Sequence, residues 1–189
     1  MLRKIGIGAV VFLLVLIVAA CAGPTPAPTP APNPTPAPPP PPVLTPNPNP
    51  KPSGPIEATW IEPQLDVDSQ TVSIPVSELE DNWNIHFKLE TEDGKMNFMA
   101  YILDGEIYVR ANVCPPCRSI GFSLEEAKLI LICDRCATIF EAKTGEGIEG
   151  ACVDYPKAAV SYEITGANIV MSGADLIAAY QDTLNPGLP

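Results

Sequence analysis

The chain has 189 residues, of which 24 are proline and six cysteine, and a formal net charge of −11 at pH 7. Seventeen of the prolines lie within residues 22–55, so about 130 residues remain for a folded part, enough for one domain with a modest core. An acidic surface repels nucleic acid and anionic lipid head groups, so the composition excludes a nucleic-acid partner.

The N-terminus has the layout of an export signal. Arg3 and Lys4 precede an apolar run over residues 5–20, which ends in Val-Ala-Ala directly before Cys21. This arrangement resembles the lipobox of bacterial lipoproteins, which implies a signal peptide over residues 1–20 and lipidation of Cys21. An uncleaved signal anchor is the alternative, because the run approaches the roughly 18 to 20 residues of a spanning helix. We expect a protein tethered to the cell membrane through lipidated Cys21, on its extracytoplasmic face.

Residues 21–55 are predicted to be the lipid anchor and a Pro-rich linker. Proline has no backbone N–H and a fixed φ, so the segment should lie extended as polyproline II. At about 3.1 Å per residue it would hold the domain up to roughly 100 Å from its anchor. We interpret it as a passive spacer.

The domain that follows, residues 56–189, has the pattern of short strands broken by turns. Strands are predicted at residues 71–75, 84–89, 96–103 and 106–111, and a closing hairpin at 159–164 and 168–171. Asp-Gly pairs at residues 93–94 and 104–105 predict hairpin turns. Residues 123–127 suggest a short capped turn, and residues 173–180 a terminal helix. The predicted fold class is mainly β (α+β), a small β-meander or barrel-like domain with a short C-terminal helix.

Five cysteines lie in this domain: Cys114, Cys117, Cys133, Cys136 and Cys152. The first four form two Cys-x-x-Cys pairs separated by fifteen residues. Each pair predicts a tight turn, or knuckle, and two knuckles can close a tetrahedron of thiolates around a metal centre. Thiolates select zinc, copper(I) or iron-sulfur clusters over hard cations. We predict the four paired cysteines as ligands; Cys152 is a fifth or substituting ligand, a supporting thiol, or a small buried residue.

Two other interpretations of these cysteines stay open. Exported chains often use paired cysteines as disulfides, although an odd count of five and the size of the domain argue against this. Cys114-Pro-Pro-Cys117 also resembles a thioredoxin-type active site, but a predicted β-meander precedes it and no helix start follows. Since the carboxylates show no arrangement that separates an acid from a base, we expect a protein that is not an enzyme. The only histidine, His86, is predicted to be a hydrogen-bonded core or edge residue of a strand and not a ligand.

Two families share motifs with the cysteine region. The stretch from Leu129 through Thr144-Gly-Glu to Tyr155-Pro156 is similar in rhythm to the cluster-binding half of Rieske proteins, but cysteine stands where Rieske proteins have histidine. Residues 70–172 more closely resemble the iron-sulfur-containing membrane proteins related to FtrD, a component of bacterial iron-transport systems. That resemblance includes Asn112-Val-Cys114-Pro-Pro-Cys117, Ile132-Cys133-Asp-Arg-Cys136 and Gly150-Ala-Cys152.

The resemblance implies an Fe-S cluster at the cell envelope that serves electron transfer or iron handling, with membrane redox or iron-transport proteins as partners. The alternatives are a zinc-ribbon-like module, in which zinc only holds the loops for a protein partner, and a thiol-disulfide oxidoreductase.

Overall fold

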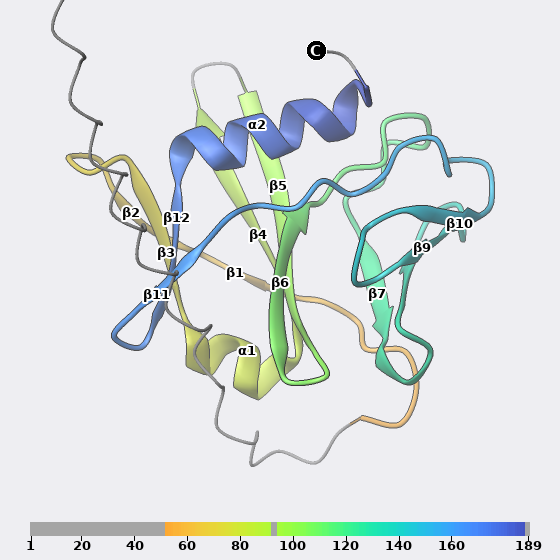
Figure 1. Ribbon diagram of the computed structural model, residues 1–189, viewed down its shortest axis with the longest axis horizontal. Helices are drawn as coiled ribbons and strands as arrows, with labels where there is room; N and C mark the ends of the chain where they lie inside the picture. Colours follow the sequence, from red (N-terminus) through yellow and green to blue (C-terminus); the bar gives the residue numbers. More distant parts are fainter. Residues whose placement is uncertain (1–51, 92–93, 188–189) are drawn as a thin grey trace, which may run out of the picture. The chain divides into compact units, whose positions relative to one another are not determined.

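The computed structural model describes residues 52–91 and 94–187, which belong to one unit of the chain. The predicted signal peptide, Cys21 and most of the Pro-rich linker lie outside these residues. Three four-stranded β-sheets and two α-helices make up the described part (Figure 1). None of the helices in these two ranges is long and apolar enough to cross a membrane.

The central sheet contains the predicted meander. Its strand order is β1-β4-β5-β6, with β1 (Thr59–Ile61), β4 (Asn84–Thr91), β5 (Gly94–Leu103) and β6 (Glu106–Ala111). The strands β4, β5 and β6 are antiparallel neighbours, whereas β1 joins β4 in parallel. Asp104 and Gly105 both have positive φ, as a tight two-residue hairpin requires, and this fixes the register of β5 against β6.

A second sheet has the order β11-β12-β3-β2 and contains the closing hairpin. Its strands are β2 (Gln64–Asp66), β3 (Thr71–Pro75), β11 (Glu163–Thr165) and β12 (Asn168–Ser172). The helix α1 (Val76–Asn82) follows β3, and α2 (Gly173–Leu184) follows β12. Ser172 caps α2, because its hydroxyl accepts a hydrogen bond from the backbone N–H of Asp175 at 3.0 Å.

The third sheet carries most of the cysteine region. Its order is β10-β9-β8-β7, with β7 (Phe122–Glu125), β8 (Ile130–Cys133), β9 (Ile139–Glu141) and β10 (Gly147–Glu149); the 3-10 helix η1 (Glu126–Lys128) joins β7 to β8. In Figure 1 this sheet lies to the right of the central meander.

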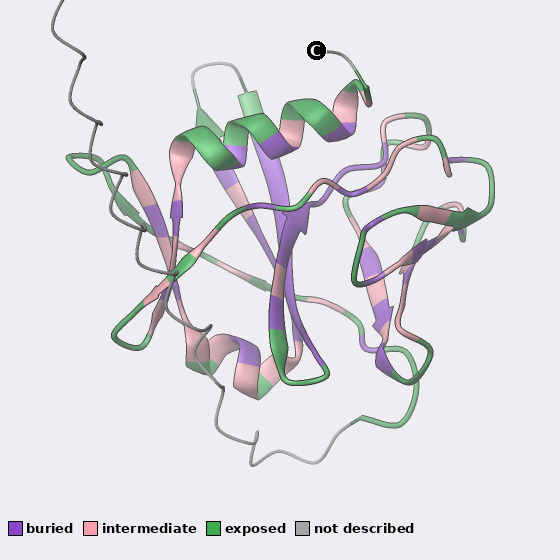
Figure 2. Ribbon diagram, in the orientation of Figure 1, coloured by how far each residue is buried: buried purple, intermediate pink, exposed green. Residues whose placement is uncertain are grey.

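Strand β5 is buried on both faces and separates two hydrophobic cores (Figure 2). Phe98, Ala100 and Ile102 pack into the core formed with the second sheet and α2. Met99, Tyr101 and Leu103 alternate with them and pack into the core under the cysteine sheet. The cysteine sheet is therefore held on the opposite face of the meander from the C-terminal helix.

Most of the predicted fold is confirmed, with four corrections. The fold is mainly β with a C-terminal helix, and none of the three sheets closes, so the meander form of the prediction holds and the barrel-like form does not. Residues 122–125 form a strand before the 3-10 turn, because the apolar alternation of Phe122 and Leu124 faces the core. The first strand of the closing hairpin covers only residues 163–165 and is shorter than predicted. The helix α1 was not predicted, because it is only seven residues long and has one buried side chain.

Candidate metal centre

The two Cys-x-x-Cys pairs fold into knuckles with the same backbone hydrogen bonds. In the first knuckle the N–H of Cys114 donates to the carbonyl of Ser119, and the N–H of Arg118 donates to the carbonyl of Cys114. In the second, the N–H of Cys133 donates to Thr138 O and the N–H of Ala137 donates to Cys133 O. The partners are four and five residues after the first cysteine in both cases.

The same backbone strain occurs at one position of each knuckle. Arg118 has φ of 57° and Ala137 has φ of 56°, so both adopt the left-handed conformation that glycine favours. Each residue directly follows the second cysteine of its pair. The matching geometry shows that both Cys-x-x-Cys pairs adopt the same knuckle turn.

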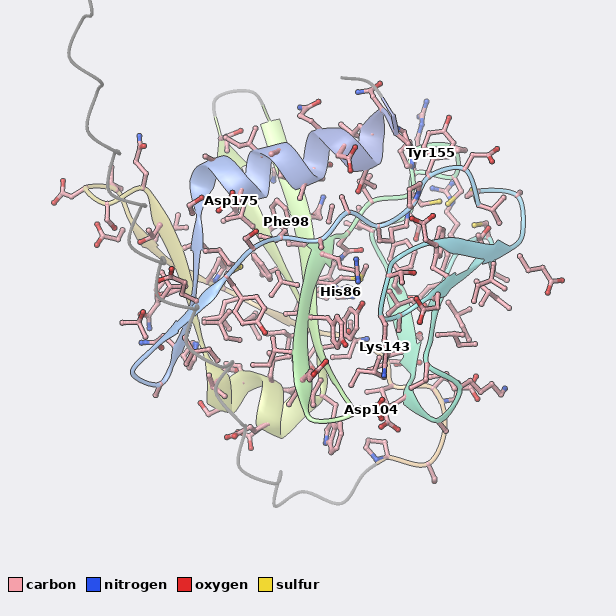
Figure 3. The ribbon with its side chains drawn as sticks, in the orientation of Figure 1. His86, Phe98, Asp104, Lys143, Tyr155 and Asp175 are labelled. Atoms are coloured by element: carbon pink, nitrogen blue, oxygen red, sulfur yellow. The ribbon has the colours of Figure 1, made fainter. Side chains whose placement is uncertain are left out.

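Four thiols converge from three parts of the chain. The Sγ atoms of Cys114, Cys117, Cys136 and Cys152 all lie within 4.8 Å of one another. Cys133 is outside this set, although its Sγ lies 3.7 Å from that of Cys117. Sulfur atoms gather next to Tyr155 in Figure 3. The structure thus brings Cys152 into the group from a segment remote in sequence from both knuckles.

The position of Cys152 depends on Gly150 and Thr138. Gly150 has φ of 119°, and a Cβ atom there would lie 2.7 Å from Thr138 Cα, so only glycine allows this close approach. The Thr138 hydroxyl oxygen accepts a hydrogen bond from the N–H of Cys152 at 3.2 Å and lies 3.2 Å from Cys136 Sγ. Because the Thr138 oxygen accepts a hydrogen bond from Cys152, the hydroxyl proton is free to be donated to the Cys136 sulfur. One buried threonine therefore links two of the four cysteines.

The thiols differ in their electrostatic surroundings. Burial raises the pKa of Cys114 and of Cys133, whose side chains are 0% and 1% exposed. Cys136 is only partly buried; burial raises its pKa, but hydrogen bonds from Thr138 and the neighbouring thiols outweigh this and lower the pKa of Cys136 to about 6. A metal centre would replace the protons of all its ligands. Cys136 gives up its proton more readily than the buried Cys114 and Cys133.

Arg110 on β6 attaches the cysteine sheet to the central meander. This buried guanidinium donates to Tyr101 Oη at 2.9 Å and to the carbonyls of Thr144 and Lys157, each at 2.8 Å, and also to the carbonyl of Lys143. The Arg110 side chain therefore holds both the turn after β9 and the segment after Cys152 in place through hydrogen bonds.

Sequence reasoning did not find Arg110, Thr138 or Lys157, because their roles depend on contacts with residues far along the chain. A single arginine in an apolar strand and a lysine after Tyr155-Pro156 were the available signals. His86 is buried and is not among the four converging residues, and neither of its ring nitrogens has a hydrogen-bond partner within residues 52–91 and 94–187. The predicted core position is confirmed, but the expected hydrogen-bond partner is not found in this part of the chain.

The donor set fits an iron-sulfur group in its chemistry. Four cysteine thiolates are the ligands of [2Fe–2S] and [4Fe–4S] clusters. At a metal–sulfur distance of about 2.3 Å, two thiolates on one tetrahedral ion are about 3.8 Å apart. The Sγ atoms of Cys136 and Cys152 are 3.7 Å apart, which matches two ligands of one ion.

The fold and the thiol group define a small β protein with a cysteine-ligated metal centre. The family model of "Membrane iron-sulfur containing protein FtrD-like" matches residues 79–182, more than half of the chain. The chain therefore belongs to the FtrD-like family of membrane iron-sulfur containing proteins, and its cofactor is an Fe-S group.

Solved structures are similar to this chain at low identity, and no curated protein matches. One is a complex of reduced oxygenase and oxidized ferredoxin in carbazole 1,9a-dioxygenase (12% identity, 56% of this chain and 94% of that chain, TM-score 0.45). Another is the ferredoxin of carbazole 1,9a-dioxygenase from Nocardioides aromaticivorans IC177 (15%, 64% and 98%, TM-score 0.42). A third is the plasma membrane Rieske protein PetC3 from Synechocystis PCC 6803 (16%, 52% and 94%, TM-score 0.40).

Proposed function

We propose that this protein is a non-catalytic electron carrier whose Fe-S group is bound by Cys114, Cys117, Cys136 and Cys152. The observation that supports this most directly is the convergence of these four thiols within 4.8 Å in a member of an iron-sulfur family. The centre lies at the surface end of the cysteine sheet, where Cys117 and Cys136 are partly exposed. A partner can approach such a centre closely enough to exchange an electron.

This ligand set differs from the four paired cysteines in one member. Cys152 takes the place of Cys133, because Cys152 Sγ lies within 4.8 Å of all three other sulfur atoms, and Cys133 is not a member of this group of four. Cys133 remains 3.7 Å from Cys117 and is a thiol that supports the centre without binding it.

The proposal places the domain outside the cytoplasm, on a membrane tether. The N-terminal pattern supports lipidation at Cys21, with the Pro-rich linker as spacer. Partners in this setting are membrane redox or iron-transport proteins. Cys21→Ser in the native cells tests the tether: we expect the protein to leave the membrane fraction and to lose labelling by an alkyne-tagged fatty acid. Retention in the membrane without labelling would support a signal anchor instead.

The test of the cofactor is an anaerobic purification of the full chain. We expect iron with acid-labile sulfide and a visible absorption band that bleaches on reduction with dithionite and returns on oxidation. A colourless protein with one zinc per chain would refute the electron-transfer proposal. The 3.7 Å spacing of Cys136 and Cys152 favours this zinc clamp as the second candidate, because it is the spacing of two ligands on a single ion.

Two matched serine variants test the ligand set. Cys152→Ser should lose most of the iron and sulfide, since it removes a ligand, whereas Cys133→Ser should retain both. The two thiols are equally buried, at 2% and 1% exposure, so the loss of stability from placing a serine in the core should be similar in both variants. The reverse result would return Cys133 to the ligand set.

A thiol-disulfide oxidoreductase predicts a different outcome. Such an enzyme requires one free, reactive thiolate, and hydrogen bonds lower the pKa of Cys136 to about 6. We expect iodoacetamide to leave Cys136 unmodified in the metal-loaded protein, because the metal binds its sulfur. Rapid alkylation of Cys136 with the iron still bound would contradict the proposal.

A further inference from the structure

Lys157 is a fully buried cation bound next to the first knuckle. Its side chain is 0% exposed, and its Nζ donates to the carbonyls of Val113 at 2.9 Å and Tyr155 at 2.5 Å. Val113 precedes the first cysteine of the first knuckle. The ammonium also lies over the rings of Phe140 at 4.4 Å and Phe122 at 5.4 Å, measured from Nζ to each ring centroid.

No carboxylate neutralises this charge among the described residues. Each of the other lysines in residues 52–91 and 94–187 has a carboxylate within 4 Å: Lys88 with Glu62, Lys95 with Glu90, Lys128 with Glu125, and Lys143 with Asp104. Taking an ammonium out of water without an anion is costly, and two carbonyls with two aromatic faces offset only part of that cost.

The groups near Lys157 that lose their protons when a metal binds are the thiols. Burial lowers the pKa of Lys157 to about 8, and the electrostatic partners that oppose this by raising it are Cys114, Cys133, Cys152 and Cys117. Three of these four belong to the converging set. The backbone of Lys157 is also fixed, because its N–H donates to Gly145 O and its carbonyl accepts from Arg110. The backbone of Lys157 is therefore held on both sides, and its Nζ is held on the carbonyl of Val113, the residue before Cys114.

We propose that the Lys157 ammonium is the fixed counter-charge of the Fe-S centre and raises its reduction potential. This inference rests on the proposed electron-carrier function. Reduction adds one electron to the centre, supplied by a redox partner protein, and breaks no bond at Lys157, which keeps its proton. A nearby positive charge stabilises the more negative reduced state more than the oxidised state, so it shifts the equilibrium toward reduction.

The experiment compares the potentials of four full-length variants by anaerobic spectroelectrochemistry, with iron and sulfide measured in each. Lys157→Met and Lys157→Gln remove the charge, Lys157→Arg keeps it, and Lys95→Met removes an exposed lysine paired with Glu90 as a control. We expect the two neutral variants to have a more negative potential, by at least about tenfold in the reduction equilibrium constant, or about 59 mV for one electron. The K157R and K95M variants should stay close to the wild type.

Every outcome decides the proposal. Neutral variants that load iron fully and keep the wild-type potential overturn it. The neutral variants could instead fail to retain iron. In that case, iron retention by K157R at a potential close to that of the wild type supports the requirement for a positive charge. Loss of iron from all three Lys157 variants shows that the shape of the lysine side chain matters and not its charge, and overturns the proposal. Wild-type protein without a reversible iron-based reduction refutes the electron-carrier function itself, which the wild-type scan shows before any variant is compared.

Discussion

Replacing Thr138 with valine removes one hydroxyl and keeps the shape of the side chain. Thr138 is fully buried, its oxygen accepts from the N–H of Cys152 at 3.2 Å, and it lies 3.2 Å from the sulfur of Cys136. The variant leaves the Cys152 N–H without this acceptor, which costs about 1 to 3 kcal/mol for a buried donor. It also removes the hydroxyl that lowers the pKa of Cys136.

Two measurements follow from this loss. The free energy of unfolding of the metal-loaded full chain in urea should fall by about 2 kcal/mol. Iron should pass to a competing chelator at roughly 10- to 100-fold lower chelator concentration, the usual effect of removing a hydrogen-bond partner of a metal ligand.

Thr91→Val is the matched control, because it removes an exposed threonine hydroxyl that donates to Gly94 O at 2.9 Å. It should change the free energy of unfolding by less than about 0.5 kcal/mol. If Thr138→Val unfolds and exchanges iron as the wild type does, the hydroxyl has no part in holding Cys136 and Cys152 together, and our account of that link is refuted.

Three further predictions about the scaffold are tested by urea unfolding. Burial lowers the pKa of His86 to about 4, so between about pH 6.5 and pH 4 the folded state binds fewer protons than the unfolded state. The free energy of unfolding of the wild type should therefore fall by up to about 3 kcal/mol as pH falls over that range. His86→Leu should abolish this pH dependence. A wild-type profile that is flat over that range, or a leucine variant with the same slope, would contradict this. Arg110→Met should lower the free energy of unfolding by about 3 to 5 kcal/mol, because it leaves buried carbonyls without their hydrogen-bond donor. Lys143→Met breaks a surface ion pair and should lower it by less than about 1 kcal/mol. Equal losses in the two variants would refute the role of Arg110. Ala137→Gly should stabilise the protein by up to about 1 kcal/mol by relieving the left-handed φ of 56°, and a clear loss of stability would argue against strain at this knuckle.

The meander and the chemistry of the centre could be predicted from local sequence. Asp104-Gly105 specifies a two-residue turn through its own backbone preferences, so the pairing of β5 with β6 follows from a short segment. The Cys-x-x-Cys spacing likewise specifies a knuckle, because the hydrogen bonds that form it join residues only four and five positions apart. Both features depend on contacts that are close in sequence.

The choice among five thiols depended on contacts that are distant in sequence. Spacing alone favours the four paired cysteines, but the tertiary structure brings Cys152 to the group through the close approach of Gly150 to Thr138, and leaves Cys133 outside it. A buried cation beside the first knuckle is invisible in the sequence for the same reason, since Lys157 meets Val113, 44 positions earlier, only after the intervening chain has folded. The sequence by itself determined which atoms could bind a metal, because residue type and local turns carry that information. Only the packing of the cysteine sheet against the meander decided which of those atoms meet and which charge faces them.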